Sequence, residues 1–363
     1  MSSDPGRATL PRKPRAWPLA GGLIAGAVAD ALLGDPNRAH PVALFGSVAR
    51  VLEDRLYAPS RARGAILTAC GLALATAPAI AGTMACRHQP TARLACTTAC
   101  TWTVIAPRSL AAAAERIRQA LMADDIRAAR HMLPALCGRD PDHLNKAQIA
   151  MAVIESVAEN TNDAIVAPLL WGALADNPGM VAYRAVNTLD AMVGYRNARY
   201  EHFGFASARL DDAANWAPAR LTALLTAACA PVVDGQPSLA WRTARCYGPL
   251  HPSPNAGWCE AAFGGALGLR LGGPTRYRWR TENRPVLGDG RAPEPTDIRR
   301  AIRLSRAVTV AATGAAAALA MTLDAPAGRR GKLARSLSPR LFAAVTQRGG
   351  GWRSRRRGGE SGR

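Results

Sequence analysis

Apolar runs without charge alternate with long polar stretches along the chain. The longest uncharged run covers residues 64–86, which are 23 residues between Arg63 and Arg87. A helix that crosses a membrane needs roughly 20 mostly apolar residues, so this run predicts a membrane-spanning helix. A second run covers the 17 residues 307–323, and its Ala-rich sequence is only weakly hydrophobic. We interpret it as a further candidate span.

Four shorter apolar runs have lengths that fit either buried core helices or re-entrant segments. They cover residues 16–29, 94–107, 164–175 and 221–233. Long polar stretches lie between the apolar runs, at residues 115–163, 176–220 and 234–306. No stretch alternates apolar and polar residues convincingly, so strands are not expected. The pattern predicts an all-α, polytopic integral-membrane protein with long polar segments between its apolar helices.

Composition and charge predict a basic tail at each end of the chain. Hydrophobic residues make up 48% of the 363 residues but aromatic residues only 5%, which favours helices packed closely through small side chains. The net charge is +20, and residues 329–363 carry ten arginines and one lysine against one acid. We expect a basic N-terminal tail over 1–15, a helical membrane catalytic domain over 16–325 and a disordered Arg/Gly-rich tail over 326–363.

Two function classes fit this composition poorly. The basic C-terminal segment has only Phe342 and Trp352 as aromatic residues among its arginines and no accompanying folded module, so nucleic acid is not an expected partner. We expect the segment to lie near anionic membrane lipid instead. The eight cysteines form no CxxC pair and have no histidine at metal-ligand spacing, so neither a disulfide framework nor a zinc site is indicated.

The first candidate for chemistry is an acidic face on a predicted helix. Glu155, Glu159 and Asp163 stand at i, i+4 and i+8 between apolar segments, so a continuous helix places them on one face. Like charges at this spacing repel one another, and burial makes each more costly. We therefore expect Mg²⁺, an arginine or both to face them. The alternative is a solvated helix turn at the membrane surface.

A second candidate lies at residues 209–220, immediately before an apolar run. Asp211, Asp212 and Asn215 offer the hard oxygen ligands that Mg²⁺ prefers. Arg209 and Arg220 flank them and are suited to phosphate or carboxylate. Further upstream, Asn187 and Asp190 are spaced i, i+3. The simpler alternative is that Asp211 caps a helix.

A third candidate is the segment His251-Pro252-Ser253-Pro254-Asn255, followed by a Gly-rich helical stretch. Its two prolines fix a rigid loop. The backbone N–H groups at the start of the next helix are able to bind an anion. A plain structured loop is the alternative, and His251 alone does not indicate a ligand. Gly34-Asp35-Pro36, His40-Pro41 and Gly138-Arg139-Asp140 form a weaker fourth group.

Five stretches in order resemble the CobD/CbiB family of cobalamin biosynthesis. They are GDPNRAHPV, GRDPDHLNKAQIAMAVIESVAENTNDAIVAPLLW, YRAVNTLDAMVGYRN, ARLDDAANWAPARLTALL and HPSPNAGWCEAAFGGALGLRLGG. The resemblance implies a multi-pass enzyme of the cytoplasmic (inner) membrane. It implies a reaction that joins aminopropanol, or its phosphate, to the free propionate of adenosylcobyric acid, with ATP as co-substrate. Other cobalamin-assembly enzymes are candidate partners.

The implied reaction needs an activated carboxylate. Phosphorylation by MgATP converts a carboxylate into an acyl phosphate that an amine can attack, which requires metal-holding carboxylates, cations for phosphate and a base for the ammonium group. We assign catalytic roles to Glu155, Glu159, Asp163 and Asp212. Metal binding is assigned to Glu155, Glu159, Asp163 and Asp211. Contacts to substrate or phosphate are assigned to Arg139, Asn187, Arg209, Asn215, Arg220, Ser253 and Asn255.

The chain departs from the family pattern at Cys259, where the family usually has proline, and in its Arg-rich tail, which has no counterpart there. Two other classes remain as alternatives. A Mg²⁺-dependent intramembrane prenyltransferase also places acidic motifs on helices, but its usual paired motifs are missing: Asn162-Asp163 is followed by Ala-Ile-Val-Ala. A small membrane transporter would use buried carboxylates as an ion path.

Overall fold

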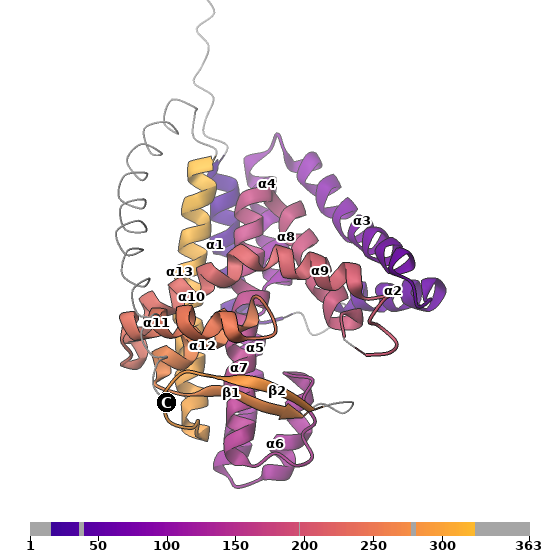
Figure 1. Ribbon diagram of the computed structural model, residues 1–363. Coiled ribbons are helices and arrows are strands. Elements are labelled where there is room, and N and C mark those ends of the chain that lie inside the picture. Colours follow the sequence, from indigo (N-terminus) through magenta and orange to yellow (C-terminus); the bar gives the residue numbers. More distant parts are fainter. Residues whose placement is uncertain (1–15, 36–39, 196, 277–280, 324–363) are drawn as a thin grey trace, which may run out of the picture.

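The computed structural model describes residues 16–35, 40–195, 197–276 and 281–323 (Figure 1). Both predicted tails lie outside the described residues. Helices account for most of the described chain. The helices of the first half are α1 (Ala16–Leu33), α2 (Pro41–Leu56), α3 (Arg61–Cys86), α4 (Pro90–Val104), α5 (Pro107–Met122), α6 (Ile126–Met132), η1 (Leu133–Ala135) and α7 (Lys146–Thr161).

The second half contains the remaining helices and one hairpin. Its helices are η2 (Asn162–Val166), α8 (Ala167–Val193), α9 (Phe205–Ala214), α10 (Trp216–Cys229), η3 (Ala230–Val233), α11 (Pro237–Tyr247), η4 (Gly248–Leu250), α12 (Ala256–Leu267) and α13 (Pro295–Leu323). Strands β1 (Leu271–Arg276) and β2 (Thr281–Leu287) pair antiparallel, with an irregular register between Gly272 and Pro274. The all-α prediction is confirmed, except that it missed this hairpin.

Three helical stretches are long and apolar enough to cross a membrane. They are Arg61–Cys86, Trp216–Val233 and Pro295–Leu323. The first and third contain the two runs that the sequence predicts as spans, and the second contains one of the shorter runs. Trp17–Leu33 is a shorter apolar helix. The structure is therefore compatible with a membrane protein.

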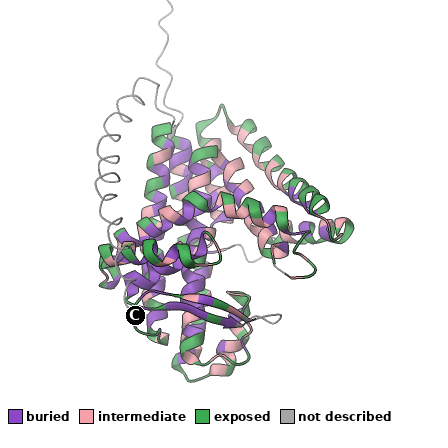
Figure 2. Ribbon diagram, viewed as in Figure 1, coloured by how far each residue is buried: buried purple, intermediate pink, exposed green. Residues whose placement is uncertain are grey.

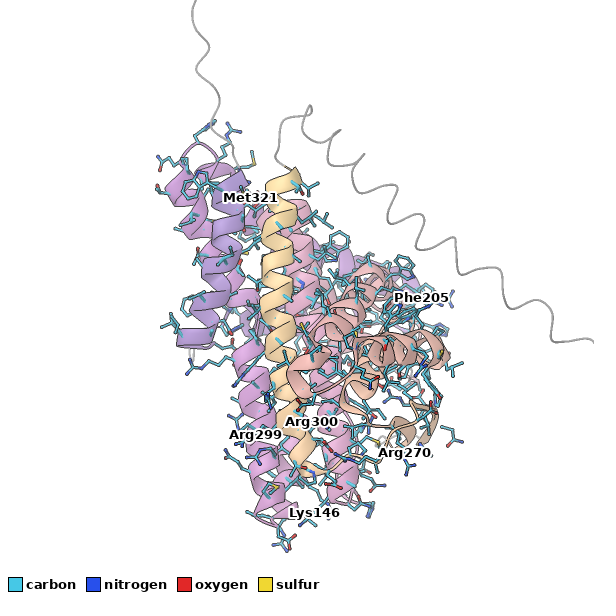
Figure 3. All side chains as sticks on the ribbon, turned by 90° about the vertical axis from the view of Figure 1, so that its left-hand side faces the viewer. Lys146, Phe205, Arg270, Arg299, Arg300 and Met321 are labelled. Carbon is cyan, nitrogen blue, oxygen red and sulfur yellow. The ribbon has the colours of Figure 1, made fainter. Side chains whose placement is uncertain are left out.

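Helix α13 forms an axis with one charged end and one apolar end. It packs against α1, α5, α7, α8 and α10. In Figure 3 Arg299 and Arg300 lie toward its lower end, and Met321 lies near its upper end. Val310, near the middle of the helix, is 75% exposed. An exposed apolar side chain of this kind suits a lipid neighbour, whereas the arginines suit water. Figure 2 shows the buried residues concentrated in α7, α12 and the adjoining parts of the bundle.

Helices α1 and α4 approach closely through small residues. A Cβ atom on Gly22 would lie 2.5 Å from Thr97 Cβ, and one on Gly26 would lie 2.4 Å from Thr101 Cβ. Glycines spaced four residues apart let two helix backbones come together, as in packed membrane helices. The Ala- and Gly-rich composition is thus used for close helix contacts.

Helix α8 is interrupted and reverses direction. Ala175 and Asp176 have non-helical backbone angles, with φ of 61° at Asp176. At this bend the Arg93 guanidinium of α4 forms an ion pair with the Asp176 carboxylate, at an N–O distance of 2.6 Å. The reversal returns Asn187 to hydrogen-bonding distance of Asp163, 24 residues earlier, whereas a straight helix would separate them by roughly 36 Å. The run at 164–175 is therefore one arm of a helical hairpin.

The α1–α4 contact predicts a large difference between two glycines. Gly26→Ala should destabilise the protein by about 1–3 kcal/mol, because the new methyl group overlaps Thr101. Gly314→Ala is the matched control: its added Cβ meets nothing within 4 Å, so alanine should stabilise α13 by up to about 1 kcal/mol. Thermal unfolding of the purified variants measures both changes. Equal effects at the two positions would contradict close α1–α4 packing.

Candidate active site

A cavity of about 400 Å³ lies where η2, α8, α9, α12 and β2 meet. Acidic side chains dominate its lining, and Arg284 and His251 also face it. The lining residues with ionisable side chains are Glu159, Asp163, Asp190, Tyr195, Asp211, Asp212, His251, Glu260, Glu282 and Arg284. Concave sites of this size commonly bind small molecules. The cavity is therefore the candidate active site.

The end of α7 directs two carboxylates into the cavity. Helix α7 ends at Thr161, and the chain continues as one π-helical turn, Asn162–Val166. Such turns insert extra backbone into a helix and change the direction of its side chains, often at functional sites. Glu159 precedes the π-helical turn and Asp163 lies within it. Both line the cavity.

Glu155 belongs to a different environment. Its carboxylate forms ion pairs with Arg139 and with Arg284, which lies 3.5 Å away, and accepts a 2.6 Å hydrogen bond from the Gly272 N–H. It is 3% exposed and does not line the cavity. Helical spacing predicts one shared face for Glu155, Glu159 and Asp163; in the structure Glu159 and Asp163 line the cavity, and Glu155 lies in the ion-pair cluster next to it. The expected arginines are present: Arg139 and Arg284 pair with Glu155, and their positive charge also acts on Glu159.

Arg284 joins the hairpin to the helices. Its guanidinium lies 2.7 and 2.8 Å from the two carboxylate oxygens of Glu260 on α12 and also contacts the imidazole of His251. All three side chains line the cavity. Burial lowers the pKa of His251. The hairpin therefore contributes a cation whose charge is shared between two buried carboxylates.

A closed ring of hydrogen bonds holds Asp163 and Asp211 side by side. The Asn187 amide donates to both Asp163 Oδ2 and Asp211 Oδ1 at 3.3 Å. Asn215 donates to Asp211 Oδ2 at 3.0 Å, and Asn162 donates to Asp163 Oδ1 at 2.8 Å. Asn162 also donates to Asn215 Oδ1 at 2.7 Å. These five side chains, named here the amide ring, come from η2, α8, α9 and the α9–α10 junction.

The cavity carboxylates hold their protons more tightly than free acids. The pKa of Glu159 is raised to about 8, first by desolvation and then by the charges of Asp163 and Glu260. Desolvation also raises the pKa of Asp163 and Asp211, and raises that of Asp190 to about 6. Each carboxylate would be stabilised by a bound cation, because positive charge favours the ionised form.

The remaining predicted residues divide into three groups. Asp212 and Ser253 line the cavity. Asn215 and Asn255 line a small polar chamber of about 30 Å³ beside it, together with Glu159, Asp163 and Asp211. Arg139, Arg209 and Arg220 line neither space. The roles assigned to all these residues stay predictions.

The three arginines have other partners. Arg139 is buried against Glu155. Arg220 donates to Asn255 Oδ1 and to the Trp216 carbonyl oxygen at 2.9 Å, which ties α10 to the loop before α12. Arg209 has a 69% exposed side chain and lies 3.9 Å from Asp212, so it stands at the rim of the cavity.

Sequence reasoning missed Arg284 and Glu282, because both belong to the unpredicted hairpin. It noted His251 without giving it a role, and it gave Glu260 none. Their signal was weak: Arg284 lies in the segment TENRPVL, which matches no motif. Among the residues that the structure describes, no group of three or more His, Cys, Asp or Glu side chains has the arrangement of a metal site. The metal-binding roles assigned to Glu155, Glu159, Asp163 and Asp211 stay predictions.

The fold and cavity define a helical protein with apolar spans and an acidic small-molecule site. The family model for "CobD/Cbib protein" matches residues 23–305. A relative from Mycobacterium tuberculosis, "Cobalamin biosynthesis protein CobD", is 49% identical over 296 residues, which cover 80% of this chain and 92% of the relative. The chain belongs to the CobD/CbiB family.

Further relatives agree with this assignment. Proteins with the same description from Chromobacterium violaceum and Geobacter metallireducens are 42% and 41% identical. The first match covers 76% of this chain and 88% of the relative, and the second covers 78% and 92%. No solved structure is significantly similar to the chain.

The environment of Glu155 predicts a large loss of stability on its removal. Glu155→Ala should lower the free energy of unfolding by about 3–5 kcal/mol, because two buried arginines lose a shared carboxylate. The control Glu294→Ala removes a 65% exposed side chain 4.0 Å from Arg291 and should cost at most about 1 kcal/mol. Chemical unfolding of purified protein gives both values. A Glu155→Ala protein of unchanged stability would show that this contact does not hold the hairpin.

Because the pKa of Glu159 is raised, replacing this residue should stabilise the protein by an amount that depends on pH. Between the unfolded-state pKa near 4.5 and the folded value of about 8, folding requires this carboxyl group to keep its proton. Its stability contribution is therefore complete below the lower value and is lost as pH rises through the upper one. Glu159→Gln should raise the melting temperature of the ligand-free protein, increasingly from pH 5 to pH 8. Glu201→Gln, at an exposed position, is the control. A gain that does not change with pH would contradict the assignment.

Proposed function

We propose that the chain is an ATP-dependent ligase that joins aminopropanol, or its phosphate, to the free propionate of adenosylcobyric acid. Family membership supports a role in cobalamin biosynthesis. The observation that carries the chemical proposal is the convergence of Glu159, Asp163 and Asp211 from three elements on one cavity. Carboxylates with raised pKa values match a reaction that needs both a metal ion and a base near neutral pH.

The donor set fits Mg²⁺. Asp163 and Asp211 offer hard oxygens side by side, held by neutral amides. Mg²⁺ usually takes one or two protein carboxylates and completes its octahedron with water and substrate phosphate, so a cage of three or more acids is not required. We assign Asp163 and Asp211 to hold the ion. When bound, it would offset the negative charge of the ATP phosphates.

Glu159 is the proposed general base. The ATP γ-phosphoryl group passes to the propionate oxygen and releases ADP, and the amine then attacks the acyl carbon and displaces inorganic phosphate. The nucleophile arrives as an ammonium ion and must lose a proton first. In its ionised form, a carboxylate with a pKa of about 8 is a stronger base than an ordinary glutamate, and a cation bound beside it would increase the ionised fraction at neutral pH. Arg209, at the rim beside Asp212, is the proposed contact for a phosphate that enters the cavity.

The cavity volume places limits on the bound substrate. A space of about 400 Å³ holds the propionate arm, the amine and a phosphoryl group. A corrin macrocycle with its side chains is larger, so we place the ring at the mouth of the cavity. We further propose that the chain is a multi-pass protein of the cytoplasmic membrane. The prenyltransferase and transporter alternatives are disfavoured by the family assignment.

Carbonate-washed membranes from cells that express the chain should form the amide. The assay supplies adenosylcobyric acid, MgATP and either aminopropanol or its phosphate, and mass spectrometry detects the product. Glu159→Gln should lower the rate by roughly 10²-fold, because it removes the base, whereas Glu201→Gln should leave it unchanged. Absence of amide with both amines would contradict the ligase proposal. Activity that washes into the supernatant would contradict the membrane assignment.

A further inference from the structure

The amide ring is built so that each carboxylate oxygen of Asp163 and Asp211 accepts one N–H. Asn187 supplies two of these four bonds from a single NH₂ group. The two hydrogens of a planar amide diverge, so one side chain is able to serve two acceptors. Asn187 is therefore the member that directly links the two carboxylates.

Outer contacts fix the orientation of the other two amides. Tyr183 donates to Asn215 Oδ1 at 2.8 Å, and Thr222 donates to Asn162 Oδ1 at 3.0 Å. Because these oxygens are occupied as acceptors, the NH₂ groups of Asn162 and Asn215 face the carboxylates. Asn162 and Asn215 are each 2% exposed. The ring is thus held from behind, on the side away from the cavity.

The ring differs in charge from the cluster around Glu155. Glu155 is paired with arginines that neutralise it. The hydrogen-bond donors to Asp163 and Asp211 within the ring are neutral amides, which orient the carboxylates without cancelling their charge. Glu159 lies close enough to Asp163, and Asp190 close enough to Asp211, to add negative charge, and Arg184 is a counter-charge that acts on Asp163. Such an arrangement concentrates acidic groups at one place on the cavity wall.

We propose that Asn187 is a positioning residue that sets the spacing of Asp163 and Asp211 for a divalent cation. The inference rests on the proposed function, because it takes this pair to be the one that holds the ion. It replaces the predicted role of Asn187 as a phosphate contact. Asn215 and Asn162 support the same geometry from either side, one on each aspartate. Partners of this kind, which orient metal ligands, commonly change metal affinity 10- to 100-fold on mutation.

Binding of Mn²⁺ alone to the purified full-length protein tests the inference without substrates or turnover. Electron paramagnetic resonance of free Mn²⁺ gives the dissociation constant. Asn187→Ala should raise it at least about tenfold, and Asp211→Asn should raise it further because a ligand charge is lost. Asn160→Ala is the matched control: this asparagine lies on α7, donates to the Ser156 carbonyl oxygen and does not line the cavity.

A second variant and a second measurement separate positioning from folding. Asn215→Ala breaks the ring at Asp211 Oδ2 and should weaken Mn²⁺ binding in the same direction. For any variant with a wild-type melting temperature, the Mg²⁺ concentration for half-maximal amide formation should rise while kcat at saturating Mg²⁺ largely recovers. Unchanged Mn²⁺ affinity in both ring variants would overturn the inference and leave the ligase proposal intact. Wild-type protein that binds no Mn²⁺ would also overturn it, whatever the amide assay shows.

Discussion

The carboxylate of Glu155 lies between two arginines, and through them it connects segments that are far apart in the sequence. Arg139 approaches from the loop before α7, and Arg284 approaches from β2 while it also holds Glu260 of α12. Uncompensated buried charges cost several kcal/mol each, so these groups are stable only together. The hairpin therefore stays on the helices, and its position closes one wall of the cavity. The acidic cavity depends on this neutralised cluster beside it.

Two breaks in helical regularity bring the functional carboxylates together. The π-helical turn after Thr161 turns Asp163 toward the cavity, and the reversal at Ala175 and Asp176 returns the second arm of α8 to the same level. Asp176 has a positive φ without being glycine, a conformation that surrounding contacts must stabilise. Its ion pair with Arg93 supplies one such contact. Backbone strain at the bend of the helical hairpin in α8 thus accompanies the close approach of Asn187 and Asp163 at its other end.

The sequence predicted the helices well because their signal is local. An uncharged run such as 64–86 predicts a helix from its own residues, without information on the segments that pack against it. The grouping of acids was harder to predict. Helical spacing grouped Glu155 with Glu159 but could not show that Arg139 and Arg284 would bind Glu155, because Arg284 belongs to a hairpin without an alternating strand pattern. The amide ring also depends on the reversal of α8, where Asn177-Pro178-Gly179 mark a break in the helix but do not reveal which residues the second arm will meet. The sequence showed the aspartates and asparagines of the amide ring, but tertiary structure determines which of them form hydrogen bonds with each other.

The charge balance of the cavity constrains the order in which ligands can enter. Seven acidic side chains line it, against the shared charge of Arg284 and a His251 whose pKa burial lowers. An isolated carboxylate or phosphate would be repelled by this wall, while a metal ion or an ammonium group would be attracted. Coulomb energy between like charges also grows as water is displaced. In the proposed reaction the cations must therefore be in place before the propionate and the ATP phosphates approach each other closely. The same acidity that makes the ligand-free cavity costly then becomes the source of its affinity for the amine.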